Sequence, residues 1–191
     1  MDRRADLLAR YVLDASMPGN THLSFVNFSF WGEEVDVFGN ILALLAGLPW
    51  NRAVAGRVVA ALRALEVDRP YPVRAVGHPI ETDNPLWRRY MERHRQNFPY
   101  QYHNGGIWPF IGGFWVILLA RQGMDAEAGE ALTRRSNDWE FNEWFHGSSG
   151  AALGMPRQSW NAAMFVLAYQ TLRRRDAGLW LTTPPNDAIW I

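Results

Sequence analysis

The sequence predicts an all-α protein built from helical hairpins in two layers. Apolar residues recur at helical spacing in most segments, and short links join two pairs of predicted helices as antiparallel neighbours. In each pair the first helix is more apolar than the second, which is typical of an inner helix followed by an outer one. We place one domain over 1–191, with an apolar tail at 178–191.

The first three helices follow from apolar stripes. A short stripe predicts a helix over 4–13. The segment 36–48 carries a longer stripe that follows Asp36, a possible N-cap, and stops before Pro49. The segment 52–65 repeats apolar residues on one face and arginines on the other, as an outer helix does.

The later helices differ in how much apolar surface they carry. The segment 86–95 is polar and is expected at the periphery, whereas 110–122 is apolar on nearly all sides and predicts a buried helix. The segment 126–135 is short and polar-faced, and 159–172 is expected to be central. With 4–13 as a further outer member, the layered helices number about six.

Composition excludes several classes of function. The 19 basic and 19 acidic residues cancel, so no overall positive field exists to attract nucleic acid or a membrane surface. The chain has no cysteine, and its five histidines show no metal-ligand spacing, so we expect no disulfide, metal or cofactor. Since it has neither a membrane-length apolar run nor a signal-peptide core, we expect a cytoplasmic protein.

Four long connections hold most of the residues suited to chemistry. They span 14–35, 66–85, 96–109 and 136–158, and they are rich in Gly, His and Trp. Connections longer than about 12–15 residues are usually functional, and most of these lead into predicted inner helices. Function is therefore expected at one end of the helical layers.

Three of these loops contain candidate site residues. In the segment 102–109, an indole could stack on a sugar ring while Asn and His bond its hydroxyls, although a turn with a half-buried Trp explains the same pattern. Glutamates lie among aromatics in 139–147, a setting that suits acid–base chemistry but also describes a solvated edge. In 154–161, Ser159 and Trp160 either serve a site or simply cap and pack the next helix.

Four segments resemble the six-hairpin, (α/α)6-barrel glycoside hydrolases, in particular the neutral/alkaline invertase group and the amylo-α-1,6-glucosidase or glycogen-debranching-like proteins. The segments are VDVFGNILALLAGL, QYHNGGIWPFIGGFWV at 101–116, NEWFHG at 142–147 and GMPRQSWNAAMFVLAY at 154–169. They occur in the family's order. They correspond to its C-terminal half, so the resemblance implies about half of the barrel, with long loops at one end.

The resemblance implies inverting hydrolysis of an α-glucoside or a sucrose-like disaccharide, in which two carboxyl groups face the sugar from opposite sides. Glu143 matches the family's general base. The residues that match its sugar-pocket motifs are His103, Asn104, Gly105, Trp108, Gln158 and Trp160. Asp36 is a possible substrate contact. The family's general acid is an aspartate in the N-terminal half, which this sequence does not contain.

A half-barrel leaves apolar edges, so we expect a homodimer or a complementary half-barrel as partner. A non-catalytic sugar-binding or regulatory remnant is the alternative function. A helical scaffold whose aromatic loops contact protein is a third possibility.

Overall fold

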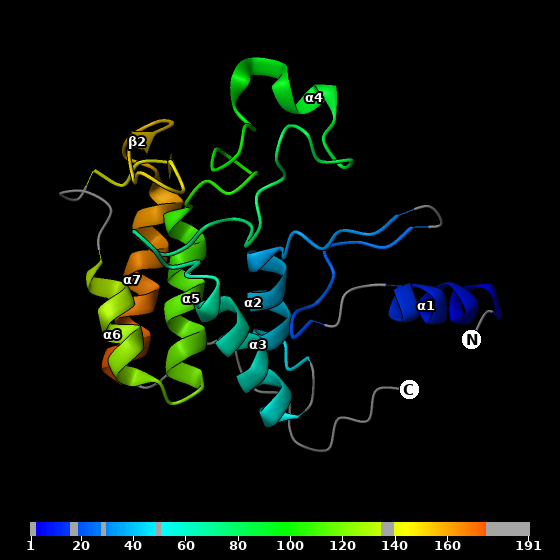
Figure 1. Ribbon diagram of the computed structural model, residues 1–191. Coiled ribbons are helices and arrows are strands. Elements are labelled where there is room, and N and C mark those ends of the chain that lie inside the picture. The colour runs from blue at the N-terminus through cyan, green and yellow to red at the C-terminus, as the bar shows by residue number, and fades with distance from the viewer. Residues whose placement is uncertain (1–2, 16–18, 28–29, 49–50, 135–139, 175–191) are drawn as a thin grey trace.

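The computed structural model describes residues 3–15, 19–27, 30–48, 51–134 and 140–174 (Figure 1). Its elements, in chain order, are α1 (Arg3–Ala15), α2 (Val37–Leu45), α3 (Arg52–Ala64), α4 (Arg89–Glu92), the 3-10 helix η1 (Arg93–Arg95), α5 (Pro109–Arg121), α6 (Asp125–Thr133), β1 (Trp144–Phe145), β2 (Ala152–Leu153) and α7 (Ser159–Arg174). The all-α prediction is confirmed. Within the described part of the chain, no helix combines the length and the apolar character needed to cross a membrane.

Helix α5 is the centre of the structure. It packs against α2, α6 and α7, and every residue over 115–119 is buried, as the apolar sequence predicts. Helices α2, α5 and α7 form the inner layer, while α3 lies against α2, and α6 lies against α5 and α7. This is the inner and outer arrangement expected for about half of an (α/α)6 barrel.

Two adjacent glycines let α5 approach its neighbours closely. A Cβ atom added to Gly113 would lie 2.8 Å from the Cβ of Met164 in α7. A Cβ added to Gly112 would lie 2.4 Å from the carbonyl oxygen of Pro72. Because real Cβ atoms do not approach other atoms so closely, both positions require glycine, and the inner helices meet nearly backbone to backbone.

The three inner helices begin at the same end of the molecule, where the long connections gather (Figure 1). Helix α2 begins with an N-cap at Asp36, whose Oδ1 accepts a 3.0 Å hydrogen bond from the Gly39 amide. Helix α5 begins with Pro109 at its first turn, where a missing amide costs nothing. The predicted concentration of loops at one end is therefore confirmed.

Two sequence predictions differ from the structure, and one feature of the structure was not predicted. The helix expected over 86–95 is reduced to α4 and η1, because His94 adopts a left-handed φ of 61° and interrupts it. Helix α1 stands apart from the other helices (Figure 1) and contacts the loop through Tyr11 and Trp31, so it is not an outer hairpin member. The pairing of β1 with β2 was not predicted. The apolar tail at 178–191 lies outside the described residues.

Candidate functional site

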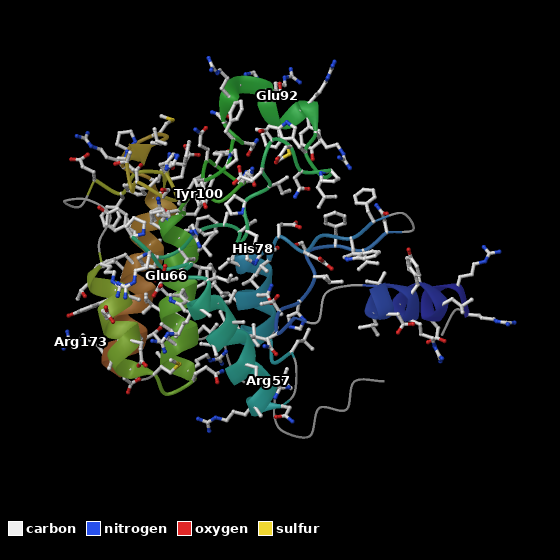
Figure 2. The ribbon with its side chains drawn as sticks, viewed as in Figure 1. Arg57, Glu66, His78, Glu92, Tyr100 and Arg173 are labelled. Atoms are coloured by element: carbon white, nitrogen blue, oxygen red, sulfur yellow. The ribbon has the colours of Figure 1, made fainter. Side chains whose placement is uncertain are left out.

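A pocket of about 640 Å³ opens where α2, α5 and α7 begin. It is lined by Ser24, Glu34, Asp36, Phe38, Ala75, Val76, Tyr102, His103, Trp108, Phe110, Ile111, Glu143 and Trp160. Figure 2 shows His78 and Tyr100 at this loop-bearing end, whereas Arg57 and Arg173 lie toward the opposite end. The walls of the pocket thus come from all three inner helices and the long connections, and the volume of the pocket is typical of a small-molecule site.

Backbone hydrogen bonds join the loops beneath the pocket. The Val37 amide donates to the Ala75 carbonyl, and the Ala75 amide donates to the Gly106 carbonyl. Ile107 and Phe145 then exchange two hydrogen bonds of 2.8 and 2.9 Å. Three connections that are distant in sequence and the start of α2 are thereby held in one continuous network, which fixes the backbone just after Glu143.

Glu143 lies in the pocket with its backbone and side chain both anchored. Its amide donates to the Met155 carbonyl at 2.7 Å, and its Oε2 accepts from the Met155 amide at 3.3 Å. The buried Asn161 side chain donates to the carbonyl of Asn142 at 2.6 Å and to that of Glu143 at 3.4 Å. The Glu143 backbone is thus fixed by several hydrogen bonds, and its carboxylate is oriented by one.

Gly154 leaves the space that the Glu143 side chain occupies. Its φ is +67°, and an added Cβ atom would lie 2.7 Å from Oε2 of Glu143 and 2.7 Å from Cδ1 of Trp144. The sequence showed Gly154 only as the start of a family segment. The structure shows that any side chain here would collide with the candidate base.

Trp108 and His103 form one aromatic wall. Their rings are stacked with centroids 5.1 Å apart and an angle of 6° between the planes. Trp108 is 5% exposed, and its indole N–H donates to the Tyr102 carbonyl at 3.0 Å. Because the indole is covered by the imidazole, a ligand in the pocket meets the His103 ring and the edge of Trp108 rather than an open Trp108 face.

Trp160 extends this wall from the first turn of α7. It is 48% exposed, and its ring lies 6.5 Å from that of Phe110, measured between centroids. Phe110 in turn contacts Phe38 edge to face at 5.3 Å. Trp160 is thus the indole in this pocket with a largely open surface, and open indole surfaces stack on the C–H faces of sugars.

His103 and Glu143 interact electrostatically across the pocket. Desolvation of the imidazole lowers the pKa of His103 below its ordinary value of 6.5, and the negative charge of Glu143 acts in the opposite direction. The net shift is downward, so His103 is neutral at pH 7. A neutral imidazole both donates and accepts hydrogen bonds, as sugar hydroxyls require.

The pocket brings together five of the residues predicted for the site and leaves three outside. Glu143, His103, Trp108, Trp160 and Asp36 line it, although Asp36 also caps α2. The buried Asn104 side chain bonds instead to both backbone groups of Ile80 and to the Asn97 carbonyl. Gly105 takes a left-handed φ of 96° in the turn, and Gln158 precedes α7. Neither lines the pocket.

One carboxylate of the pocket, Glu34, was not predicted from the sequence. Glu34 lines the pocket, and its Oε2 is buried without a hydrogen-bond partner among the described residues. The signal available in the sequence was its position, two residues before the N-cap Asp36. No three His, Asp or Glu side chains within the described segments cluster closely enough to hold a metal ion.

The fold and the pocket together define a class, the six-hairpin glycosidases, of which this chain forms about half a barrel. Solved structures support the fold. A GH63 mannosylglycerate hydrolase from Thermus thermophilus in complex with glucose superimposes with a TM-score of 0.53 at 19% identity, over 86% of this chain and 36% of that one. An uncharacterized conserved protein from the same organism gives a TM-score of 0.56 at 18% identity, over 77% and 34%.

The model of the alkaline and neutral invertase family matches residues 16–175, and the chain belongs to this family. It is 27% identical over 182 residues to neutral/alkaline invertase 3, chloroplastic, of Oryza sativa subsp. japonica, with 90% of this chain covered. It is 23% identical over 180 residues to alkaline/neutral invertase E, chloroplastic, of Arabidopsis thaliana, with 88% covered. The chain spans only 28% and 27% of the lengths of these relatives.

Proposed function

We propose that this chain is the water-activating half of a glycoside hydrolase acting on an α-glucoside or a sucrose-like disaccharide with inversion. Glu143 is the general base, Trp160 and the His103–Trp108 wall hold the sugar ring, and His103 bonds a hydroxyl. The observation that carries the proposal is the anchored Glu143 carboxylate in an aromatic pocket with a neutral imidazole. Membership in the invertase family supports the choice of substrate class.

The proposed reaction needs a second carboxyl group across the sugar from Glu143. In an inverting enzyme the two groups stand roughly 6.5–9.5 Å apart, so that a water fits between the base and the anomeric carbon. Asp36 is engaged in capping α2, and no acid of the chain matches the family's acid motif. We therefore propose that the acid comes from helices of the barrel that these residues do not form.

A partner that completes the barrel is proposed to be a second copy of this chain or a complementary half-barrel, and only a complementary half-barrel would bring the family's acid motif. Apolar side chains are exposed on the inner helices, with exposed fractions of 39% for Leu42, 56% for Val166 and 41% for Tyr169. Covering such residues favours association. A dimeric mass in solution scattering at micromolar concentration is expected, and a monomeric mass would exclude the homodimer.

A cytoplasmic location stays a prediction.

The hydrolase is tested by release of reducing sugar from sucrose and a panel of α-glucosides. Glu143→Gln should lower turnover by about 10²–10⁴-fold, the usual contribution of a positioned base. Glu140→Gln is the matched control, because Glu140 is an exposed neighbour outside the pocket, and it should retain activity. Equal activity in the two variants would remove Glu143 from the proposed role.

A sugar-binding half-barrel without turnover is the second candidate. The observation that favours it is the engagement of Asp36 in the helix cap, which leaves Glu143 without a free acid of the family type. This candidate predicts that saccharides change Trp fluorescence through Trp160 while no substrate of the panel is hydrolysed. Hydrolysis that depends on Glu143 would exclude it.

A further inference from the structure

A second pocket of about 500 Å³ adjoins the sugar pocket. Glu34, Val76 and His103 line both, so the two spaces share one wall. The second pocket is built by the loop before α2 and the segment that carries α4. Its remaining lining residues are Phe25, Phe30, Ile80, Leu86, Arg88, Tyr90, Met91, Asn97 and Asn104.

Three polar side chains of this second pocket, those of Arg88, Asn97 and Asn104, are engaged in hydrogen bonds within the fold. Asn104 bonds to the backbone of Ile80 and Asn97. The Arg88 guanidinium donates to the carbonyls of Pro85 and Trp87 at 2.6 and 3.0 Å. The Asn97 Oδ1 accepts from the His103 amide. A sugar placed here would lose the hydration of its hydroxyls and find few free partners.

The other walls are apolar and aromatic. Phe25 and Phe30 meet edge to face at 5.4 Å, and the Arg88 guanidinium lies 5.8 Å from the centre of the Phe30 ring. Leu86, Tyr90 and Met91 complete this side. An aromatic ring would gain contact area and ring–ring interactions here without leaving polar groups unpaired.

We propose that the second pocket binds an apolar aglycone, so that the preferred ligand of this site is an aryl α-glucoside rather than a disaccharide. The sugar occupies the pocket of Glu143, and the aryl group occupies the pocket of Tyr90. The two parts of the ligand meet beside Glu34, Val76 and His103, the residues that line both pockets. The inference rests on the proposed sugar pocket and specifies its substrate class.

Binding by the full chain in the Glu143→Gln background tests this inference, because turnover is then blocked. Calorimetric titration should show phenyl α-D-glucopyranoside binding at least about tenfold more tightly than methyl α-D-glucopyranoside, as burial of one ring predicts. Sucrose should bind more weakly than the phenyl glucoside. Sucrose binding as tight as, or tighter than, the phenyl glucoside would overturn the inference.

Tyr90→Ala, added to this background, should bring the phenyl and methyl affinities together. Tyr90 is 73% exposed, so its truncation leaves the fold intact. Arg89→Ala, at an exposed neighbour of Tyr90 that lines neither pocket, should keep the aryl preference. An aryl preference unchanged by Tyr90→Ala would also overturn the inference. Absence of hydrolysis in the wild-type chain with the aryl preference intact would instead remove only the catalytic proposal.

Discussion

Substitution of Gly154 by alanine should disrupt the candidate site through a collision, not merely through backbone strain. Gly154 has a φ of +67°, and its added Cβ would lie 2.7 Å from Glu143 Oε2 and 2.8 Å from Glu143 Cβ. The left-handed conformation alone costs an L-residue roughly 1–2 kcal/mol. Overpacking adds about 1–3 kcal/mol, because Glu143 and Trp144 must move to make room.

Gly123 offers a control for the backbone contribution. Its φ is +77°, nearly that of Gly154, but an added Cβ meets no atom within 4 Å. Gly123→Ala should therefore lower the free energy of unfolding by the backbone cost alone. The difference between the two variants measures the collision at Glu143.

Urea unfolding followed by circular dichroism measures both costs. In thermal unfolding, a loss of 1 kcal/mol in the free energy of unfolding corresponds to a fall in melting temperature of roughly 2–4 °C for a chain of this size. Gly154→Ala should also weaken sugar binding, measured by Trp fluorescence, whereas Gly123→Ala should leave it unchanged. Equal destabilisation and equal binding in the two variants would refute the claim that Gly154 makes room for the Glu143 carboxylate.

Three further predictions concern the groups around the pocket. NMR titration should give His103 a pKa below 6.5, and Glu143→Gln should lower that pKa further, because the variant removes the negative charge that favours the imidazolium. Since the unfolded chain binds the proton more readily than the folded chain, His103 lowers the free energy of unfolding as the pH falls below 6.5 and has no effect well above it. An unchanged His103 pKa in the Glu143→Gln variant would contradict the electrostatic interaction between His103 and Glu143. Asn161→Ala leaves the Asn142 carbonyl without its 2.6 Å hydrogen bond and should cost about 1–3 kcal/mol in urea unfolding, with weaker sugar binding because the Glu143 loop is released. Asn104→Ala removes three hydrogen bonds to backbone and should destabilise the fold by at least as much, so a fully stable variant that had lost only sugar affinity would show that Asn104 contacts the ligand instead.

The sequence predicted the helical layers well because their signal is local. The apolar segment 110–122 could only be a buried helix, and the structure places α5 at the centre. The prediction of one helix over 86–95 was wrong, because no apolar stripe supported it and His94 interrupts the helical backbone. The position of α1 away from the other helices was not predicted, because helical periodicity does not show which segment a helix contacts. Here the contact is between Tyr11 and Trp31.

The site residues were predicted correctly where the motif residue is also the one that lines the pocket. Glu143 and Trp160 lie in the pocket, but Asn104 lies in the same motif as His103 and points into the fold. A motif records which residues occur together and does not say which of them faces the ligand. Glu34 was missed because its importance depends on burial, which appears only when the loop before α2 is folded.

The pair Gly112–Gly113 fixes how closely α5 packs beside the pocket that Glu143 lines. Gly113 allows α5 to lie against the backbone of α7 at Met164, one turn beyond Trp160, and Gly112 allows the carbonyl of Pro72 to do the same on another side. The close packing of α5 on α7 and on the Pro72 backbone therefore depends on the absence of two methyl groups. A methyl group at Gly113 would push α5 away from α7, and one at Gly112 would push α5 away from the backbone of Pro72, so the pocket lining carried by Phe110 and Trp160 would shift.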